Sequence, residues 1–295
     1  NLENLHMIYD SISYASQRLN EVIFDAEHFF DGYKANPKYA LKVIKTAFDG
    51  GANWIVLCDT NGGTLPFELI HILNDVKKVI PAENLGVHFH NDTDCATYNS
   101  IESVRLGVKQ VQGTFNGLGE RCGNSNLVNV VANLTLKMDY DCKLKKNLKK
   151  LTNASRLIDE ILNRQSLNNL PYVGSAAFAH KGGLHISAVE KDPKSYEHIN
   201  PISVGNERVL VVSNQSGRSN VVNKLKKFRI STSGKEKKIL NFLDLIKNQE
   251  SLGYAYDGAE ASFELLSRRT FQNFKEFYSL ESFKVSDEKI KHIDG

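Results

Sequence analysis

Four short runs of mostly apolar residues recur at a regular interval in the first half of this chain, and this repeat constrains the fold more than any other feature. The runs begin about every 25–32 residues, and stretches with helical periodicity separate them. Alternation of this kind predicts β-α units and a parallel sheet, either doubly wound or closed as a (β/α)₈ barrel. The predicted strands are 22–24, 54–58, 85–90 and 110–114, and the predicted helices are 37–50, 66–80 and 93–107.

A cluster of polar residues follows each predicted strand. The carboxyl ends of strands carry the chemistry in parallel α/β folds. Four consecutive strands that end in this way favour a barrel over a doubly wound sheet, which concentrates its site at one switch point. A closed barrel needs eight strands, so the expected fold class is α/β with the C-terminal half of a TIM (β/α)₈ barrel over residues 1–137. The polar clusters are 25–28, 59–63, 88–92 and 114–117.

The rest of the chain predicts a mainly helical linker region over residues 138–268. A basic stretch from residue 143 to about 163 contains no aromatic residue and leads into an apolar stripe. It is therefore interpreted as a solvated helix face and not as a nucleic-acid surface. The stripe consists of Leu148, Leu151, Leu157, Ile158 and Ile161. Further predicted elements are a helix at 126–137, a Gly- and His-rich loop at 171–205, a strand at 209–212 and helices at 239–252 and 259–268.

Charge and composition exclude several classes of partner. Lys and Arg total 37 against 34 Asp and Glu, a balance that argues against a nucleic-acid or membrane-surface partner. No apolar run approaches the ~20 residues of a membrane span, and no signal peptide is visible. A cytoplasmic location is expected. The cysteines form no C-x-x-C pair, so reduced thiols are expected in place of a zinc knuckle. They are Cys58, Cys95, Cys122 and Cys142.

The pair His88 and His90 is the sharpest chemical feature of the sequence. Because side chains on a strand alternate with period two, both imidazoles face the same side and can bind one divalent cation. Two His with one carboxylate and open positions form a common catalytic metal shell. The alternative is a pair of hydrogen-bonded histidines. A third ligand is not evident, because Asp92 lies two residues beyond His90, after the strand has ended.

A glycine-rich segment at 117–124 follows the fourth predicted strand. Glycines let the backbone approach a ligand closely, and a loop after the last strand of a barrel often holds an anion. Glu120, Arg121 and Asn124 add ionisable and ligating groups to this loop. The alternative is a tight strand-to-helix turn.

Glu27 and Thr60 follow the first and second predicted strands. A carboxylate at position 27 is suited to holding substrate or acting as a base, and the Thr60 hydroxyl is suited to hydrogen-bonding a substrate carboxylate. The alternatives are a charge that complements a helix dipole, for Glu27, and a helix cap, for Thr60. His180 and His185 flank paired glycines, and one of them is a candidate acid or base; a solvent-facing His in a turn is the alternative.

Taken together, these segments resemble one family: the metal-dependent, barrel-based Claisen-condensing enzymes that include 2-isopropylmalate, homocitrate and citramalate synthases. Residues 27–32, 195–201 and 258–266 resemble the long citramalate synthase branch. The resemblance extends over nearly the whole chain. The segments that carry it are 25–32, 58–63, 88–92, 112–124 and 178–185.

The resemblance implies an acyltransferase that condenses acetyl-CoA with pyruvate to give (R)-citramalate and CoA, in the isoleucine branch of branched-chain amino-acid biosynthesis. It implies a divalent metal (Mg²⁺, Mn²⁺ or Zn²⁺) bound by His88 and His90, with Asn124 close to the ion. The alternative within the family is 2-isopropylmalate synthase, which belongs to leucine biosynthesis.

The resemblance also assigns residues to the substrate. Glu27 is implied as a catalytic residue in the keto-acid pocket, and Thr60 and Glu120 as substrate-binding residues. His185 and Tyr196 are implied to reach from an active-site loop into the partner subunit of a homodimer, where they would assist acid–base steps.

The chain departs from the family pattern at its start. The family's first barrel strand carries an acidic metal ligand and an arginine that stabilises the oxyanion, and neither has a counterpart in this chain. The chain begins at Asn1 without a methionine, and residues 269–295 resemble the start of the family's C-terminal regulatory domain. The expectation is therefore a fragment without the first barrel half, inactive by itself. The alternative is a non-catalytic fragment or partner subunit.

Overall fold

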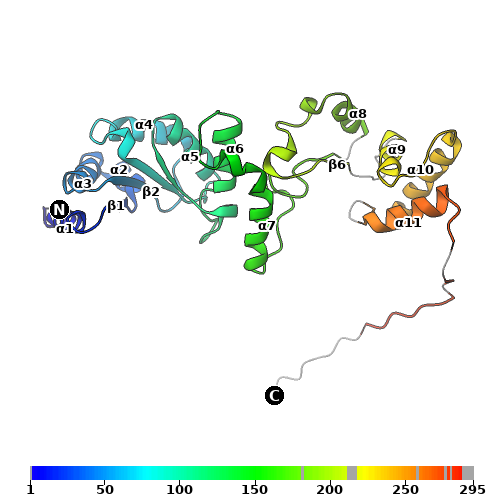
Figure 1. The fold of residues 1–295 in the computed structure, drawn as a ribbon. Coiled ribbons are helices and arrows are strands. Elements are labelled where there is room, and N and C mark those ends of the chain that lie inside the picture. The colour runs from blue at the N-terminus through cyan, green and yellow to red at the C-terminus, as the bar shows by residue number, and fades with distance from the viewer. Residues whose placement is uncertain are drawn as a thin grey trace, which may run out of the picture. The chain divides into compact units, whose positions relative to one another are not determined.

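The computed structural model describes residues 2–180, 183–210, 218–256, 259–275, 278–279 and 281–287. It divides the chain into two units, which are described separately (Figure 1). The first unit comprises Asn1–Phe178 and Glu197–Arg208, and the second comprises Ala179–Tyr196 and Val209–Gly295. The domain boundaries predicted after residues 137 and 268 stay predictions.

A four-stranded parallel sheet forms the centre of the first unit. Each strand pairs in parallel with the next one along the chain, so the spatial order equals the sequence order. The parallel α/β arrangement predicted from the repeat is confirmed. The strands are β1 (Ile23–Ala26), β2 (Trp54–Asp59), β3 (Leu85–Phe89) and β4 (Gln110–Gln112).

Helices connect the strands, as the periodicity predicts. Pro37 and Pro66 occupy first turns, where a missing N–H costs nothing, and the Asn36 side chain accepts a hydrogen bond from the backbone N–H of Tyr39 at 3.1 Å. Two helices, α1 and α2, were not predicted. The helices of this unit are α1 (Leu2–Ser16), α2 (Phe29–Ala35), α3 (Pro37–Asp49), α4 (Pro66–Val76), α5 (Ala96–Arg105), α6 (Leu127–Leu136) and α7 (Leu151–Ile161).

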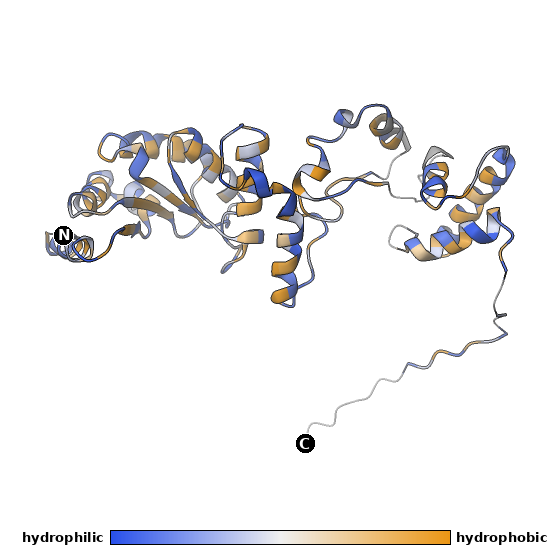
Figure 2. Ribbon diagram, in the orientation of Figure 1, coloured by the Kyte–Doolittle hydropathy of each residue, from blue (hydrophilic) through white to orange (hydrophobic). Residues whose placement is uncertain are grey.

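The two faces of the sheet differ in what they carry. Leu57, Val87 and Phe89 pack with the helices in the main hydrophobic core, and the strands are coloured largely as hydrophobic in Figure 2. Because strand side chains alternate, residues between these positions point to the opposite face. His88 and Cys58 are such residues, and they are neighbours in register between β3 and β2. The sheet therefore presents polar side chains on the face away from its core.

The sheet curves around this polar face. Strands β1 and β4 are its two edges, and three strand spacings would place them roughly 14 Å apart in a flat sheet. The amide nitrogen Nε2 of Gln112 on β4 nevertheless donates a hydrogen bond to Oδ1 of Asp25 on β1 at 3.1 Å. Such curvature is required of a barrel wall, although the half barrel itself stays a prediction.

Helix α7 and the short 3₁₀ segment η3 (Lys145–Lys150) occupy the basic stretch at 143–163. The predicted apolar stripe is inward only in part: Leu148 and Leu151 are buried, whereas Leu157 and Ile161 are 54% and 73% exposed. The buried face of α7 carries polar residues. These residues form hydrogen bonds to chain segments outside the helix. The lysines at 143–150 are exposed, as the interpretation of a solvated helix face predicts, and the apolar stripe after them is divided between the core and the solvent.

The second unit is mainly helical. Strands β5 (Ala179–His180) and β6 (Val209–Leu210) pair in parallel, and residues 211–212 of the predicted strand lie outside the described residues. A separate hydrophobic core includes Phe242 and Phe263, whose ring centroids lie 5.8 Å apart. None of the described helices is long and apolar enough to cross a membrane. The helices are α8 (Gly183–Lys191), α9 (Arg218–Lys227), α10 (Glu236–Ser251) and α11 (Glu260–Phe271).

Candidate active site

His88 and His90 lie on the same face at the carboxyl end of β3. Their ring centroids are 5.0 Å apart, with an angle of 68° between the rings. His88 is in the strand and His90 follows it directly, so the period-two alternation carries from one to the other. The two rings therefore have the common orientation that the sequence predicts.

The hydrogen bonds of the two imidazoles fix which nitrogen carries the proton. Nδ1 of His88 donates to Oε1 of Gln112 at 3.0 Å, because Gln112 turns its amide N–H toward the acceptor-only carboxylate of Asp25. Nδ1 of His90 donates to the backbone carbonyl of Asp59 at 3.3 Å. Both Nε2 atoms consequently keep a lone pair, which is the form in which histidine binds a metal.

Asn124 lies next to this pair. Its backbone forms an antiparallel bridge with His90, and its Nδ2 donates to the carbonyl of Leu118 at 2.9 Å. Its Oδ1 is buried and has no hydrogen-bond partner among the described residues. A buried, unpaired amide oxygen is costly unless a ligand satisfies it. Two imidazoles and an amide oxygen are donors that fit a divalent cation.

These three side chains do not make a complete metal shell. Within the described part of the chain, no group of three or more His, Cys, Asp and Glu side chains is placed to hold a metal ion. Asp92 is engaged elsewhere, in an ion pair with Arg121. His88, His90 and Asn124 would therefore leave coordination positions open.

Cys58 lies beside His88 in register but is not a suitable thiolate ligand. Burial, followed by the negative charges of Asp25 and Glu27, raises the pKa of the Cys58 thiol to about 12. The group is thus protonated at neutral pH, and only the thiolate is a good nucleophile or metal ligand. All four cysteines are free, which agrees with the predicted reduced thiols.

Glu27 and Thr60 meet at the carboxyl ends of β1 and β2. The Thr60 hydroxyl donates to Oε2 of Glu27 at 2.7 Å and accepts a hydrogen bond from the backbone N–H of His28 at 2.8 Å. Glu27 is exposed and precedes α2, and Thr60 caps no helix. This hydrogen bond joins two side chains that were each predicted from the sequence to contact the substrate.

Arg121 clamps the glycine-rich loop to the neighbouring loops, a role that the sequence did not reveal. Its guanidinium donates to both carboxylate oxygens of Asp92, at 2.8 and 3.1 Å, and to the carbonyl of Thr60 at 2.8 Å. These hydrogen bonds hold the pKa of the Asp92 carboxyl below its usual range. Arg121 also pairs with Glu120, whose Oε1 lies 4.0 Å from Nε2 of His90. Glu120 is thereby held at the edge of the histidine pair.

The glycine-rich segment is more than a turn between a strand and a helix. Its ends are tied to the strand with the histidines, because Asn91 N–H donates to the carbonyl of Gly123 and Ser125 N–H donates to that of Phe89, both at 2.9 Å. Gly123 has φ +83°, and a Cβ there would overlap the carbonyl oxygen of Gly117. Only glycine fits this position.

His185 and Tyr196 belong to the second unit, where their rings stack with centroids 4.3 Å apart. The ring of His180 lies edge-on to Tyr196 at 6.5 Å. Six of the eight predicted site residues thus lie in the first unit, and these two lie together in the second. Their predicted role at a partner subunit stays a prediction.

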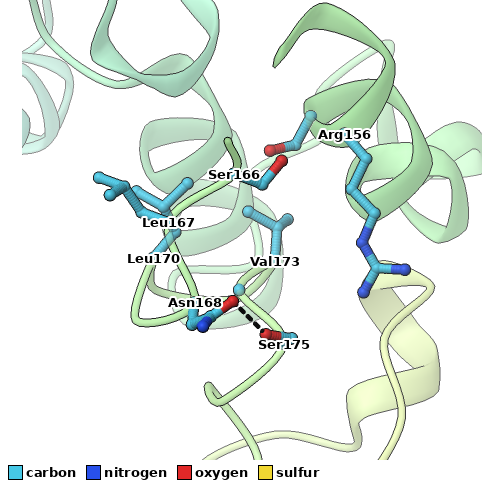
Figure 3. Close-up of a pocket in the computed structure, with 9 residues that line it drawn as sticks. Arg156, Ser166, Leu167, Asn168, Leu170, Val173 and Ser175 are labelled. Atoms are coloured by element: carbon cyan, nitrogen blue, oxygen red, sulfur yellow. Dashed lines mark hydrogen bonds between the residues drawn. The ribbon is translucent and has the colours of Figure 1, made fainter. Parts of the chain in front are cut away.

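A cavity of about 290 Å³ lies between α7 and the segment at 166–175 (Figure 3), and neither His88 nor His90 lines it. Ser155 and Arg156 of α7 line it, and the lining residue Asn168 accepts a hydrogen bond from Ser175 at 2.8 Å. Arg156 is its sole ionisable lining residue. Nothing in this lining suits acid–base chemistry.

Two family models match the chain. Residues 3–158 match the HMGL-like model, and residues 172–251 match the homocitrate synthase post-HMGL domain-like model. The first match covers more than half of the 295 residues, and the chain belongs to the HMGL-like family.

Its curated relatives include several (R)-citramalate synthases. The enzyme from Aquifex aeolicus is 50% identical over 96% of this chain and 54% of its own length. The enzyme from Geobacter sulfurreducens is 50% identical over 99% of this chain and 55% of its own length. A 2-isopropylmalate synthase from Sulfolobus acidocaldarius is 36% identical over 73% of this chain and 54% of its own. The resemblance to citramalate synthases is confirmed, and the 2-isopropylmalate synthase alternative is not favoured.

The chain spans about half the length of the curated relatives that it matches. Among solved structures, an HMG-CoA lyase from Bacillus subtilis covers 54% of this chain and 56% of its own, with a TM-score of 0.47 and 20% identity. This structure is too distant to inform the site.

Proposed function

We propose that this chain is part of an enzyme that condenses acetyl-CoA with pyruvate to give (R)-citramalate and CoA, as a step toward isoleucine. The observation that carries the proposal is the pair of imidazoles on one face of β3, both with free Nε2 atoms, beside the unpartnered Oδ1 of Asn124. The (R)-citramalate synthase relatives support the choice of substrates.

His88, His90 and Asn124 would hold a divalent cation: Mg²⁺, Mn²⁺ or Zn²⁺. When bound, this ion supplies Lewis-acid polarisation of the keto-acid carbonyl. Gln112 and the Asp59 carbonyl keep both histidines in the tautomer that can bind it. Removing a hydrogen-bond partner of a metal-binding histidine typically lowers metal affinity or activity by roughly 10–100-fold.

Glu27 and Thr60 act on the substrates in this proposal. The Thr60 hydroxyl, which now donates to Glu27, turns to the carboxylate of pyruvate and thereby frees the Glu27 carboxylate. Glu27 then serves as the general base that removes a proton from the methyl group of acetyl-CoA. The resulting carbanion attacks the keto carbon, the keto oxygen becomes an alkoxide that takes up a proton, and water then cleaves the thioester bond to give the second carboxylate of citramalate and CoA. Glu120 helps to hold the keto acid.

His185 and Tyr196 assist acid–base steps in the partner subunit of a cytoplasmic homodimer. The two rings stack and Tyr196 is about half exposed, which suits them to passing a proton to an incoming substrate. The proposal involves no nucleic acid and no membrane.

We expect the chain alone to release CoA from acetyl-CoA and pyruvate at a negligible rate, because its donors leave the metal shell incomplete. Turnover is expected when the chain is combined with the part of the Geobacter sulfurreducens relative that lies outside the aligned region. A thiol-reactive dye follows CoA release, and co-elution on a sizing column verifies that the two parts assemble.

The matched control replaces pyruvate by 2-oxoisovalerate. Turnover at least tenfold faster with pyruvate supports the proposal. Equal rates with both keto acids, an assembled complex without turnover, or robust turnover by the chain alone would contradict it.

A further inference from the structure

Helix α7 buries polar side chains where an amphipathic helix would bury apolar ones. Thr152, Ser155 and Asp159 are 1%, 2% and 4% exposed, whereas Leu157 and Ile161 are exposed. Buried polar groups are stable only when they are hydrogen-bonded, so each of these residues should have a partner. Thr152 donates to the carbonyl of Val204 at 2.8 Å. The other two have a partner near the candidate active site.

That partner is Asn116, the residue directly before the glycine-rich segment. Its Nδ2 donates to the carbonyl oxygen of Ser155 at 2.9 Å and to Oδ1 of Asp159 at 3.2 Å, and its Oδ1 accepts a hydrogen bond from the Ser155 hydroxyl at 2.6 Å. Both N–H groups and the carbonyl of the Asn116 side chain are therefore engaged by α7. Its backbone is left-handed, with φ 57° and ψ 14°.

The conformation of Asn116 sets the position of the residues that follow. The carbonyl of Gly117 accepts from the backbone N–H of Asn124 at 3.3 Å, and the carbonyl of Leu118 accepts from Nδ2 of Asn124 at 2.9 Å. The second of these bonds decides which way the Asn124 amide faces. It leaves Oδ1 as the atom without a partner. The two residues after Asn116 thus orient the proposed metal donor.

We propose that Asn116, Ser155 and Asp159 form a lock in which α7 holds the glycine-rich loop in the shape that presents Oδ1 of Asn124. Asn116 is a positioning residue in this proposal, because it acts through the loop. The lock depends on the proposed function in one respect, which is that the oxygen it places is proposed to bind a metal. Its existence as a constraint on the loop is independent of the reaction.

The variant Asn116→Gly tests the lock, because glycine keeps the left-handed backbone without strain and removes the side chain that carries the amide. Amide hydrogen exchange is measured on the chain at Gly123 and Asn124, whose N–H groups donate to the carbonyls of Glu120 and Gly117. We expect exchange at least about tenfold faster than in the unmodified chain, since three part-buried hydrogen bonds that restrain the loop are lost. The affinity for Zn²⁺ alone, measured by calorimetry, should fall by roughly 10–100-fold.

Two further variants control for effects on α7 itself. Glu160→Ala, at an exposed position of the same helix, should change neither readout. Asp159→Asn keeps an acceptor oxygen for Asn116 and should behave like the unmodified chain, whereas Asp159→Ala should resemble Asn116→Gly.

Unchanged exchange in Asn116→Gly would overturn the lock. Faster exchange with unchanged Zn²⁺ affinity would overturn its role in positioning the donor. Zn²⁺ binding to the unmodified chain that is indifferent to His88→Ala would count against the proposed function, and the exchange data would still decide whether the lock exists.

Discussion

The variant His88→Ala is expected to lower kcat/KM for citramalate formation by at least about 1,000-fold in the assembled enzyme. His88 would contribute one of two imidazole donors, and Lewis-acid polarisation supplies several kcal/mol of transition-state stabilisation, at about 1.4 kcal/mol per factor of ten. The measurement is the initial rate of CoA release over a range of pyruvate concentrations.

His71→Ala is the matched control for this variant. His71 is an exposed histidine on α4, outside the candidate site, and its removal should leave the rate within about twofold. The proposed role of His88 would be refuted by a His88→Ala enzyme that is folded and retains more than about a tenth of the rate.

The variant Gly123→Ala is expected to lower the unfolding free energy of the chain by about 1–3 kcal/mol and to remove measurable Zn²⁺ binding. A methyl group at this position would overlap the carbonyl oxygen of Gly117, and the backbone at φ +83° disfavours any side chain. The loop must therefore open, and Asn124 moves with it. Chemical denaturation and calorimetry measure the two effects.

Gly107→Ala separates backbone strain from loop closure. Gly107 has φ +107°, but a Cβ there would meet only the Ala82 methyl group at an ordinary distance of 3.4 Å. This variant should lose stability through strain and keep its Zn²⁺ affinity. If both alanine variants bound Zn²⁺ equally well, the closed shape of the loop would not matter for the site.

The sequence predicts the sheet and most of its helices because their signals are local. Strands β2 and β3 are short, buried apolar runs, and Pro37 and Pro66 mark helix starts. Helix α1 was missed because only Leu5 and Ile12 of its residues are buried, whereas other large apolar side chains on it are exposed. Ile8 and Ala15 pack with Ile12 on the core at helical spacing, but the exposed apolar residues on the other faces of the helix obscure this stripe in the sequence.

The candidate site was predictable to the extent that it depends on spacing within one strand. The common orientation of His88 and His90 follows from the pleat alone. The bond between Asp25 and Gln112 joins residues 87 positions apart, and it exists only because the sheet curves. Likewise, the bond between Asn116 and Ser155 spans 39 positions. No local sequence pattern predicts such pairs, because they form only through tertiary packing.

X-ray absorption at the zinc edge of the Zn²⁺-loaded chain tests most directly whether His88 and His90 share one cation. We expect scattering from two imidazole rings, with nitrogen at about 2.0–2.1 Å from the metal. One ring should remain after His88→Ala and one after His90→Ala. A spectrum without imidazole scattering, or one that neither substitution changes, would contradict a shared metal site at the end of β3.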